Sequence, residues 1–168
     1  MPISISGMET RLAVASKRDE RRYDGRPVAK EIEERILDAG RVSGSSQNKQ
    51  RWEFVVVEAA KELLADAVYA PGNLRGAGLV IAIVGEAGSF DVGRCAQNMM
   101  LAAWDQGVIS CPNGIRDAEL AAEICGGEVK IVLSFGYPHT PRNVERRTAE
   151  EWSTRANRKS LDQLVRRI

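Results

Sequence analysis

Residues 91–107, DVGRCAQNMMLAAWDQG, decide the fold that we expect for this chain. The stretch contains no proline, and alanine, methionine, leucine and glutamine are good helix formers. Asp91 suits the first turn of a helix, and Gly107 suits the position just past its end. Its apolar residues leave only a thin polar face, and such a helix is buried on several sides. The stretch therefore predicts a central helix, buried either by the core of the chain or by a second subunit.

Apolar runs on both sides of this stretch predict further helices and strands. Residues 79–84, LVIAIV, are apolar on both faces, which indicates a strand in the middle of a sheet. Two further strands, rich in β-branched and aromatic residues, are expected at 52–57 and 129–135. Helices are expected at residues 8–18, 28–40, 59–69 and 116–125, at a short stretch from residue 150, and at 161–168. Turns are expected at 70–73 and 112–114, and a polar loop at 43–50.

The composition limits the classes of protein to which the chain can belong. Lys plus Arg number 24 and Asp plus Glu 23, and this formal net charge of +1 gives no reason to expect nucleic acid or a membrane surface as a partner. No apolar run approaches the roughly 18 residues of a membrane-spanning helix, and residues 1–7 lack the features of a signal peptide. Three cysteines without a CxxC pair favour a reducing, cytoplasmic setting. His139 is the only histidine, so neither a zinc site nor Ser-His or Cys-His catalysis is expected.

A basic cluster, KRDERRYDGRP, covers residues 17–27. One interpretation is a solvated charged loop. The other is an anion site, because arginine forks match phosphate geometry bidentately. Arg18 and Arg21 are three residues apart, so a helical end would place both on one side. The cluster alone does not decide between the two interpretations.

Four segments of the chain carry motifs that can be compared with known families. Residues 17–23 are KRDERRY, and residues 45–54 are SSQNKQRWEF. Residues 91–111 are DVGRCAQNMMLAAWDQGVISC, and residues 135–138 are FGYP, followed by Arg146. In this order and spacing the four segments resemble the motifs of the FMN-dependent nitroreductase superfamily. Their counterparts there are RRSxRxF/Y, the loop SxxNxQPWxF, the helix pattern DxGxxxQNxxLAAxxxGxxSC, and a GYP turn with a phosphate arginine.

The resemblance covers roughly residues 12–150, and two positions depart from the family pattern. Asp19 stands where the family usually has serine, and Arg51 stands where it has proline before Trp52. The resemblance implies an α+β, nitroreductase-like fold, with a mainly antiparallel sheet flanked by helices and a long central helix packed across the two-fold axis of a homodimer. The length of 168 residues predicts one domain over residues 1–168. Residues from about 142 onward are the most polar part of the chain, so they are expected to form a C-terminal extension over the surface or the partner subunit.

The resemblance also implies an FMN site at the dimer interface, touched by both subunits. Arg18, Asp19 and Arg21 would meet the phosphate, ribityl chain and pyrimidine edge, with Arg146 as a second phosphate contact. The other implied contacts are Ser45, Ser46, Gln47 and Asn48 in a loop from the partner, Asn73 and Arg75 at the pyrimidine side, and Pro112, Asn113 and Gly114 near the N5 face. No side chain is assigned a catalytic or metal-binding role, because the flavin carries the chemistry.

The function implied by the resemblance is that of an FMN-dependent oxidoreductase. It would pass electrons from NAD(P)H to an electron-poor acceptor, such as a nitroaromatic or a quinone, by ping-pong flavin chemistry. The alternatives are a non-catalytic FMN-binding, storage or regulatory dimer, and a flavin-modifying or dehalogenating member of the superfamily. The expected partners are a second copy of the chain, NAD(P)H and a small-molecule acceptor.

Overall fold

The computed structural model describes residues 7–168, which form two compact units. One unit is the continuous segment Arg18–Arg142, and the other combines residues 7–17 with Asn143–Ile168. The expectation about a signal peptide concerns residues 1–7 and lies, apart from Gly7, outside the described residues. The single domain over residues 1–168 stays a prediction, and the expected C-terminal extension falls in the second unit.

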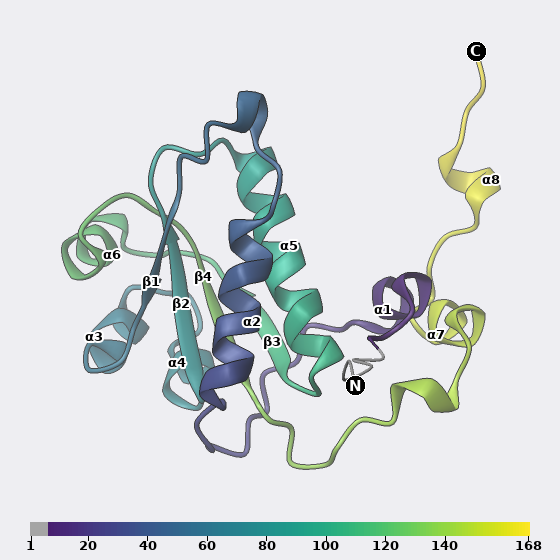
Figure 1. Ribbon diagram of the computed structural model, residues 1–168, viewed down its shortest axis with the longest axis horizontal. Helices are drawn as coiled ribbons and strands as arrows, with labels where there is room; N and C mark the ends of the chain where they lie inside the picture. The colour runs from purple at the N-terminus through teal and green to yellow at the C-terminus, as the bar shows by residue number, and fades with distance from the viewer. Residues whose placement is uncertain (1–6) are drawn as a thin grey trace, which may run out of the picture. The chain divides into compact units, whose positions relative to one another are not determined.

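An antiparallel sheet forms the centre of the Arg18–Arg142 unit (Figure 1). Its four strands are β1 (Glu53–Val56), β2 (Leu79–Val84), β3 (Ile109–Asn113) and β4 (Val129–Gly136). They lie in the order β1-β2-β4-β3, and each neighbouring pair is antiparallel. This confirms the predicted mainly antiparallel sheet. All residues of β2 are buried, as expected for a strand in the middle of a sheet.

Helices α2 (Lys30–Arg41) and α5 (Ser89–Asp105) cover one face of the sheet (Figure 1). Side chains of a strand alternate between the two faces, and Ile81, Leu133 and Phe135 share one apolar cluster with Met99 of α5. Ser134 therefore points to the opposite face. Helices α3 (Lys61–Asp66), α4 (Pro71–Arg75) and α6 (Ala118–Cys125) lie on that opposite side.

Helix α5 buries one stripe of side chains within a single chain. The stripe consists of Val92, Cys95, Ala96, Met99, Met100, Ala103 and Trp104, which recur every three or four residues. Leu101 and Ala102 outside the stripe are only half-buried, and Phe90 is 76% exposed. Gly107 follows the helix end with a φ of +73°, a conformation that glycine adopts without strain. Within one chain, α5 is thus buried on one side and not on several. Burial of its other side by a second subunit stays a prediction.

Two stretches predicted as turns belong to regular elements, so those predictions are wrong. Residues 71–73 begin α4, where Pro71 suits the first helical turn because its fixed φ is already helical. Pro112 and Asn113 end β3. Proline is tolerated there because β3 lies at one edge of the four-stranded order and need not donate on its outer side.

The second unit packs the first helix of the chain against a late one. Its elements are α1 (Thr10–Ser16), the 3-10 turn η2 (Val144–Arg146), α7 (Ala149–Arg155) and α8 (Leu161–Leu164). The Glu9 carboxylate caps α1 by accepting from the Arg11 and Leu12 amides at 2.8 Å each. The Arg11 guanidinium pairs with Glu150 of α7. A segment near the start of the described chain is thus joined to one late in the sequence within this unit.

The expected helix over 161–168 is shorter in the structure, because α8 stops at Leu164. Leu161, Leu164, Val165 and Ile168, the predicted apolar face, are all exposed. Among residues 7–168, no helix combines the length and apolar composition needed to cross a membrane.

The packing of α2 onto α5 and β1 depends on the missing side chain of Gly40. A Cβ at Gly40 would lie 2.8 Å from Cζ of Phe54 and 3.0 Å from Sδ of Met99. Gly40→Ala must displace these groups, and we expect the free energy of unfolding to fall by about 1–3 kcal/mol. The matched control is Gly72→Ala in α4, where a Cβ meets nothing within 4 Å; alanine should raise stability there by about 0.5–1 kcal/mol. Equal midpoints for the two variants in urea denaturation would contradict this packing.

Candidate functional site

The predicted basic motif begins as an extended segment beside β3. The Glu20 amide donates to the Ser110 carbonyl at 3.0 Å, and Asp19 forms a parallel bridge with Ser110. The argument that Arg18 and Arg21 share one side of a helical end is therefore wrong, because pairing with β3 sets this backbone instead. Arg18 is half-buried, whereas Asp19 and Arg21 are exposed.

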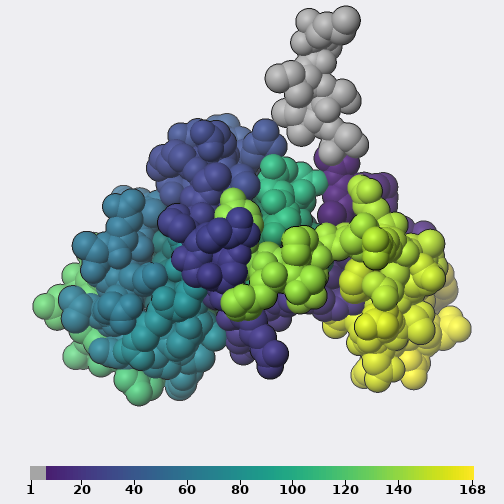
Figure 2. Space-filling model, turned by 90° about the horizontal axis from the view of Figure 1, so that it is seen from below, coloured from purple at the N-terminus to yellow at the C-terminus, as the bar shows by residue number. Residues whose placement is uncertain are grey.

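The far end of the same segment is fixed against the turn that follows β4. Tyr23 bridges Pro138, and the Asp24 amide donates to the Tyr137 carbonyl at 2.9 Å. The Arg26 guanidinium lies over the Tyr137 ring, 4.6 Å from its centroid. Figure 2 shows these two stretches, the early one in purple-blue and the later one in green, side by side on one surface. The segment is thus held at one end by β3 and at the other by the turn after β4.

Four polar side chains, which we call the amide network, connect this segment to β3, β4 and α4: Tyr23, Ser134, Asn113 and Asn73. The Tyr23 hydroxyl lies 2.8 Å from Ser134 Oγ and 3.2 Å from the Ser134 carbonyl. Ser134 Oγ donates in turn to the Cys111 carbonyl at 3.2 Å. Burial raises the pKa of the Tyr23 phenol well above its ordinary value, although the hydrogen bond to Ser134 opposes the shift. A phenol is protonated at neutral pH even without this shift, so the Tyr23 hydroxyl can donate.

The Asn113 carboxamide is the centre of the network. Its Nδ2 donates toward the Cys111 carbonyl at 3.0 Å, the Val132 carbonyl at 3.2 Å and Ser134 Oγ at 3.0 Å. Its Oδ1 accepts from Nδ2 of Asn73 at 2.9 Å. Asn113 is only 3% exposed, so its side chain is enclosed and a ligand contact from Asn113 would have to come from its backbone. Asn73 is half-buried and is the most exposed member of the network.

The remaining predicted residues near β3 have different surroundings. Pro112 is half-buried and Gly114 is exposed. Arg75 pairs with α3, its Nε lying 3.1 Å from Glu62 and its NH2 group 2.6 Å from Asp66. The structure thus links Asn73 to Tyr23 of the basic motif through Asn113 and Ser134. The Arg75 guanidinium is paired with two carboxylates.

The predicted cofactor loop lies at the N-terminal end of α5. Its centre is the 3-10 turn η1 (Ser46–Asn48), and the Ser46 amide donates to Asp91 Oδ2 at 2.9 Å. Gln47 and Asn48 both have a φ of +54°. Such left-handed backbone costs about 1–2 kcal/mol for each residue other than glycine. The loop is therefore strained, and its members apart from the half-buried Ser45 are exposed.

Helix α5 separates this loop from the basic motif. The loop contacts the first turn of α5 through Asp91, whereas the motif contacts Ser110, which follows the end of the helix. The helix has 17 residues and is about 25 Å long at the usual rise. Within one chain the structure therefore does not bring Ser45, Ser46, Gln47 and Asn48 together with the predicted residues near β3.

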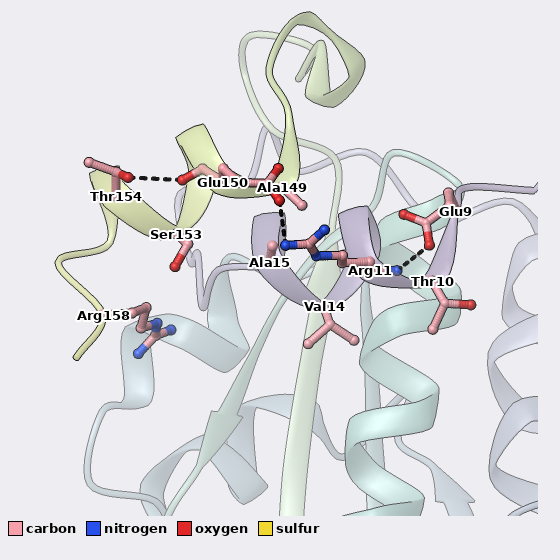
Figure 3. Close-up of a pocket in the computed structure, with 10 residues that line it drawn as sticks. All are labelled: Glu9, Thr10, Arg11, Val14, Ala15, Ala149, Glu150, Ser153, Thr154 and Arg158. Carbon is pink, nitrogen blue, oxygen red and sulfur yellow. Dashed lines mark hydrogen bonds and ion pairs between the residues drawn. The ribbon is translucent and has the colours of Figure 1, made fainter. Parts of the chain in front are cut away.

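The last predicted contact, Arg146, belongs to the second unit, where it ends η2. That unit also contains a groove of about 790 Å³ between α1 and α7 (Figure 3). Charged groups line it, among them Arg11 with its partner Glu150, and Arg158. None of the predicted cofactor residues lines this groove.

Reasoning from the sequence missed the support that Tyr23 and Ser134 give to the site. A serine inside the apolar run VKIVLSF was an available signal, because a buried hydroxyl needs a hydrogen-bond partner. Its partner Tyr23 lies 111 positions away in the sequence, so pairing the two requires the fold.

Comparisons with known proteins agree on one family. The model named Nitroreductase family matches residues 14–74 and 73–137. A nitroreductase-type protein from Desulfovibrio desulfuricans, solved in complex with FMN, has a TM-score of 0.76 at 21% identity over 94% of this chain and 96% of that chain. A nitroreductase family protein from Clostridium difficile 630 has a TM-score of 0.75 at 22% identity over 95% of this chain and 98% of that chain.

A third structure is an NADPH:FMN oxidoreductase from Vibrio harveyi complexed with NAD+. Its TM-score is 0.72 at 20% identity, over 78% of this chain and 70% of that chain. At such identities the structural likeness establishes the fold alone. No curated protein matches the sequence.

Proposed function

Because the chain belongs to the nitroreductase family, we propose that it is an FMN-dependent oxidoreductase. It passes electrons from NAD(P)H to an electron-poor acceptor, such as a nitroaromatic or a quinone. The observation that carries this proposal is the chain of hydrogen bonds that connects the basic motif, at Tyr23, to Asn73 beside β3. The Desulfovibrio desulfuricans and Vibrio harveyi proteins, with their FMN and NADPH:FMN descriptions, add support.

The residues beside β3 fit the two ends of a flavin nucleotide. Arg18 and Arg21 supply cations for a phosphate or for an electron-rich ring edge. Asn73 supplies an amide for the polar edge of the ring. FMN, when bound, supplies the hydride chemistry, and the chain supplies binding, orientation and electrostatics. No acid, base or nucleophile is assigned, in keeping with the single histidine, His139, which is exposed.

The proposed active form is a homodimer in which the loop at Ser45–Asn48 reaches the flavin of the other copy. Its support is the length of α5, since one ligand cannot span both groups of predicted residues within one chain. The exposed or half-buried side chains on α5 outside its buried stripe, Phe90, Leu101 and Ala102, supply an apolar surface for a second copy. Residues from about 142 onward would extend over the surface or over that second copy.

Anaerobic mixing with NAD(P)H tests the function directly. The FMN-loaded protein should lose its yellow absorbance within seconds, because a hydride passes from the nicotinamide to the flavin. A quinone added afterwards should restore the colour. Stable flavin binding with unchanged absorbance would support the non-catalytic FMN-binding alternative and overturn the proposed oxidoreductase.

The phosphate contact can be tested by comparing FMN with riboflavin. We expect Arg18→Ala to weaken FMN binding by about ten- to hundredfold, since charge-assisted hydrogen bonds to phosphate are among the strong ones. The affinity for riboflavin, which lacks the phosphate, should fall little in the same variant. Arg22→Ala is the matched control, because Arg22 is an exposed arginine of the same segment and should change either affinity by about threefold or less. Equal losses for both ligands in Arg18→Ala would remove the phosphate assignment.

The dimer can be tested at Leu101. Met100 is unsuitable, because it is 6% exposed in the core of its own chain and a charge there would unfold the subunit. Leu101→Asp should give a folded monomer in sedimentation at micromolar concentration. Leu63→Asp is the control: Leu63 is exposed on α3, on the other side of the sheet, and this variant should stay dimeric. A wild-type monomer at that concentration would refute the proposed dimer.

A further inference from the structure

The amide network fixes which way round each of its carboxamides lies. The backbone oxygens of Cys111 and Val132 can only accept, so the Asn113 atom that faces them must be its NH2 group. The other end of that carboxamide, Oδ1, therefore faces Asn73. An oxygen that only accepts needs a donor opposite, so Asn73 must in turn present its NH2 group to Asn113. The polarity of both amides follows from two backbone carbonyls.

One acceptor is left over at the outer end of this chain of hydrogen bonds. Nδ2 of Asn73 is directed inward, to Asn113 Oδ1 at 2.9 Å and toward Cys111 Sγ at 3.9 Å. Its Oδ1 makes no hydrogen bond to any residue among 7–168. Because Asn73 is only half-buried, this oxygen remains open to a ligand.

We propose that Asn113, Ser134 and Tyr23 are positioning residues that make Asn73 present only a carbonyl acceptor to the flavin, where it receives the imide N3–H. The inference rests on the proposed function. The polar edge of an oxidised flavin ring carries two carbonyl oxygens and this one N–H, and only the N–H can donate to Asn73. A freely rotating amide would serve either kind of group, whereas a fixed one selects the unsubstituted imide.

Tyr23 closes the inner end of the network and restricts its movement. The Tyr23 ring lies against Gly136, where a Cβ would come within 2.7 Å of it. The phenol is protonated at neutral pH, as an ordinary tyrosine is, and burial raises its pKa further, so it can donate to Ser134. Ser134 Oγ, placed between Tyr23 and Asn113, has little freedom to turn away. The constraint on Asn73 thus extends from the segment after α1 through β4 and β3 to α4.

The test compares FMN with N3-methyl-FMN, which lacks the imide proton, for binding to the apoprotein. Wild type should bind FMN about tenfold or more tightly than the methyl analogue, because the analogue leaves the Asn73 oxygen without a donor. Asn113→Ala should lower FMN affinity and bring the ratio toward about one to three, while the affinity for N3-methyl-FMN changes little. Ser134→Ala and Tyr23→Phe, which are milder and keep the fold if Asn113→Ala does not, should lower the ratio by about two- to fivefold.

The control is Ser110→Ala in the same strand as Asn113. Ser110 is also buried, but its hydroxyl makes no hydrogen bond to any described residue, so the ratio should not change. If the network is merely structural, the substitutions at Asn113, Ser134 and Tyr23 will lower the affinities for FMN and for N3-methyl-FMN by the same factor and leave their ratio unchanged. That result overturns the positioning role. If wild type binds both flavins equally well, the proposed function stands and the positioning role alone falls. If wild type binds neither flavin, both fall.

Discussion

The hydrogen bonds of one enclosed carboxamide, that of Asn113, connect the strands and the helix that carry the candidate site. A buried amide without partners costs roughly 1–3 kcal/mol for each missing hydrogen bond, so its surroundings must be arranged to satisfy it. The partners come from β3, β4 and α4, and through Ser134 from the segment that carries Tyr23. Four parts of the chain that are distant in sequence are therefore fixed relative to one another by the same few atoms.

The two faces of the sheet are held by different kinds of contact. The face under α2 and α5 is held by apolar contact, and the close approach at Gly40 shows that it tolerates little added volume. The opposite face carries the amide network beneath α4. Apolar packing has no preferred direction, whereas hydrogen bonds do. The first face can thus supply stability while the second orients the groups at the candidate site.

Elements whose signal is local could be predicted from the sequence. The helix at α5, its end before Gly107 and the buried strand β2 follow from composition and periodicity over short windows. Pro112 misled the prediction, because proline usually marks a turn and its tolerance in β3 depends on an edge position that the sequence does not reveal. The extended backbone at Asp19 depends on pairing with Ser110, some ninety residues away. Site residues could be placed in segments by resemblance, but not the contacts that decide how Asn73 is presented.

The strained loop after α2 is better explained by preorganisation for ligand binding than by a contribution to the stability of the fold. Gln47, Asn48 and Gln50 all have positive φ values, which are costly for side chains other than glycine. The bond from the Ser46 amide to Asp91 and that from the Gln50 amide to Ser45 Oγ offset part of this cost inside the same chain. A loop already held in one shape loses less conformational entropy when a ligand arrives. In the proposed dimer that ligand is bound beside β3 of the other copy, so each subunit would shape in advance a wall of a site that it cannot itself complete.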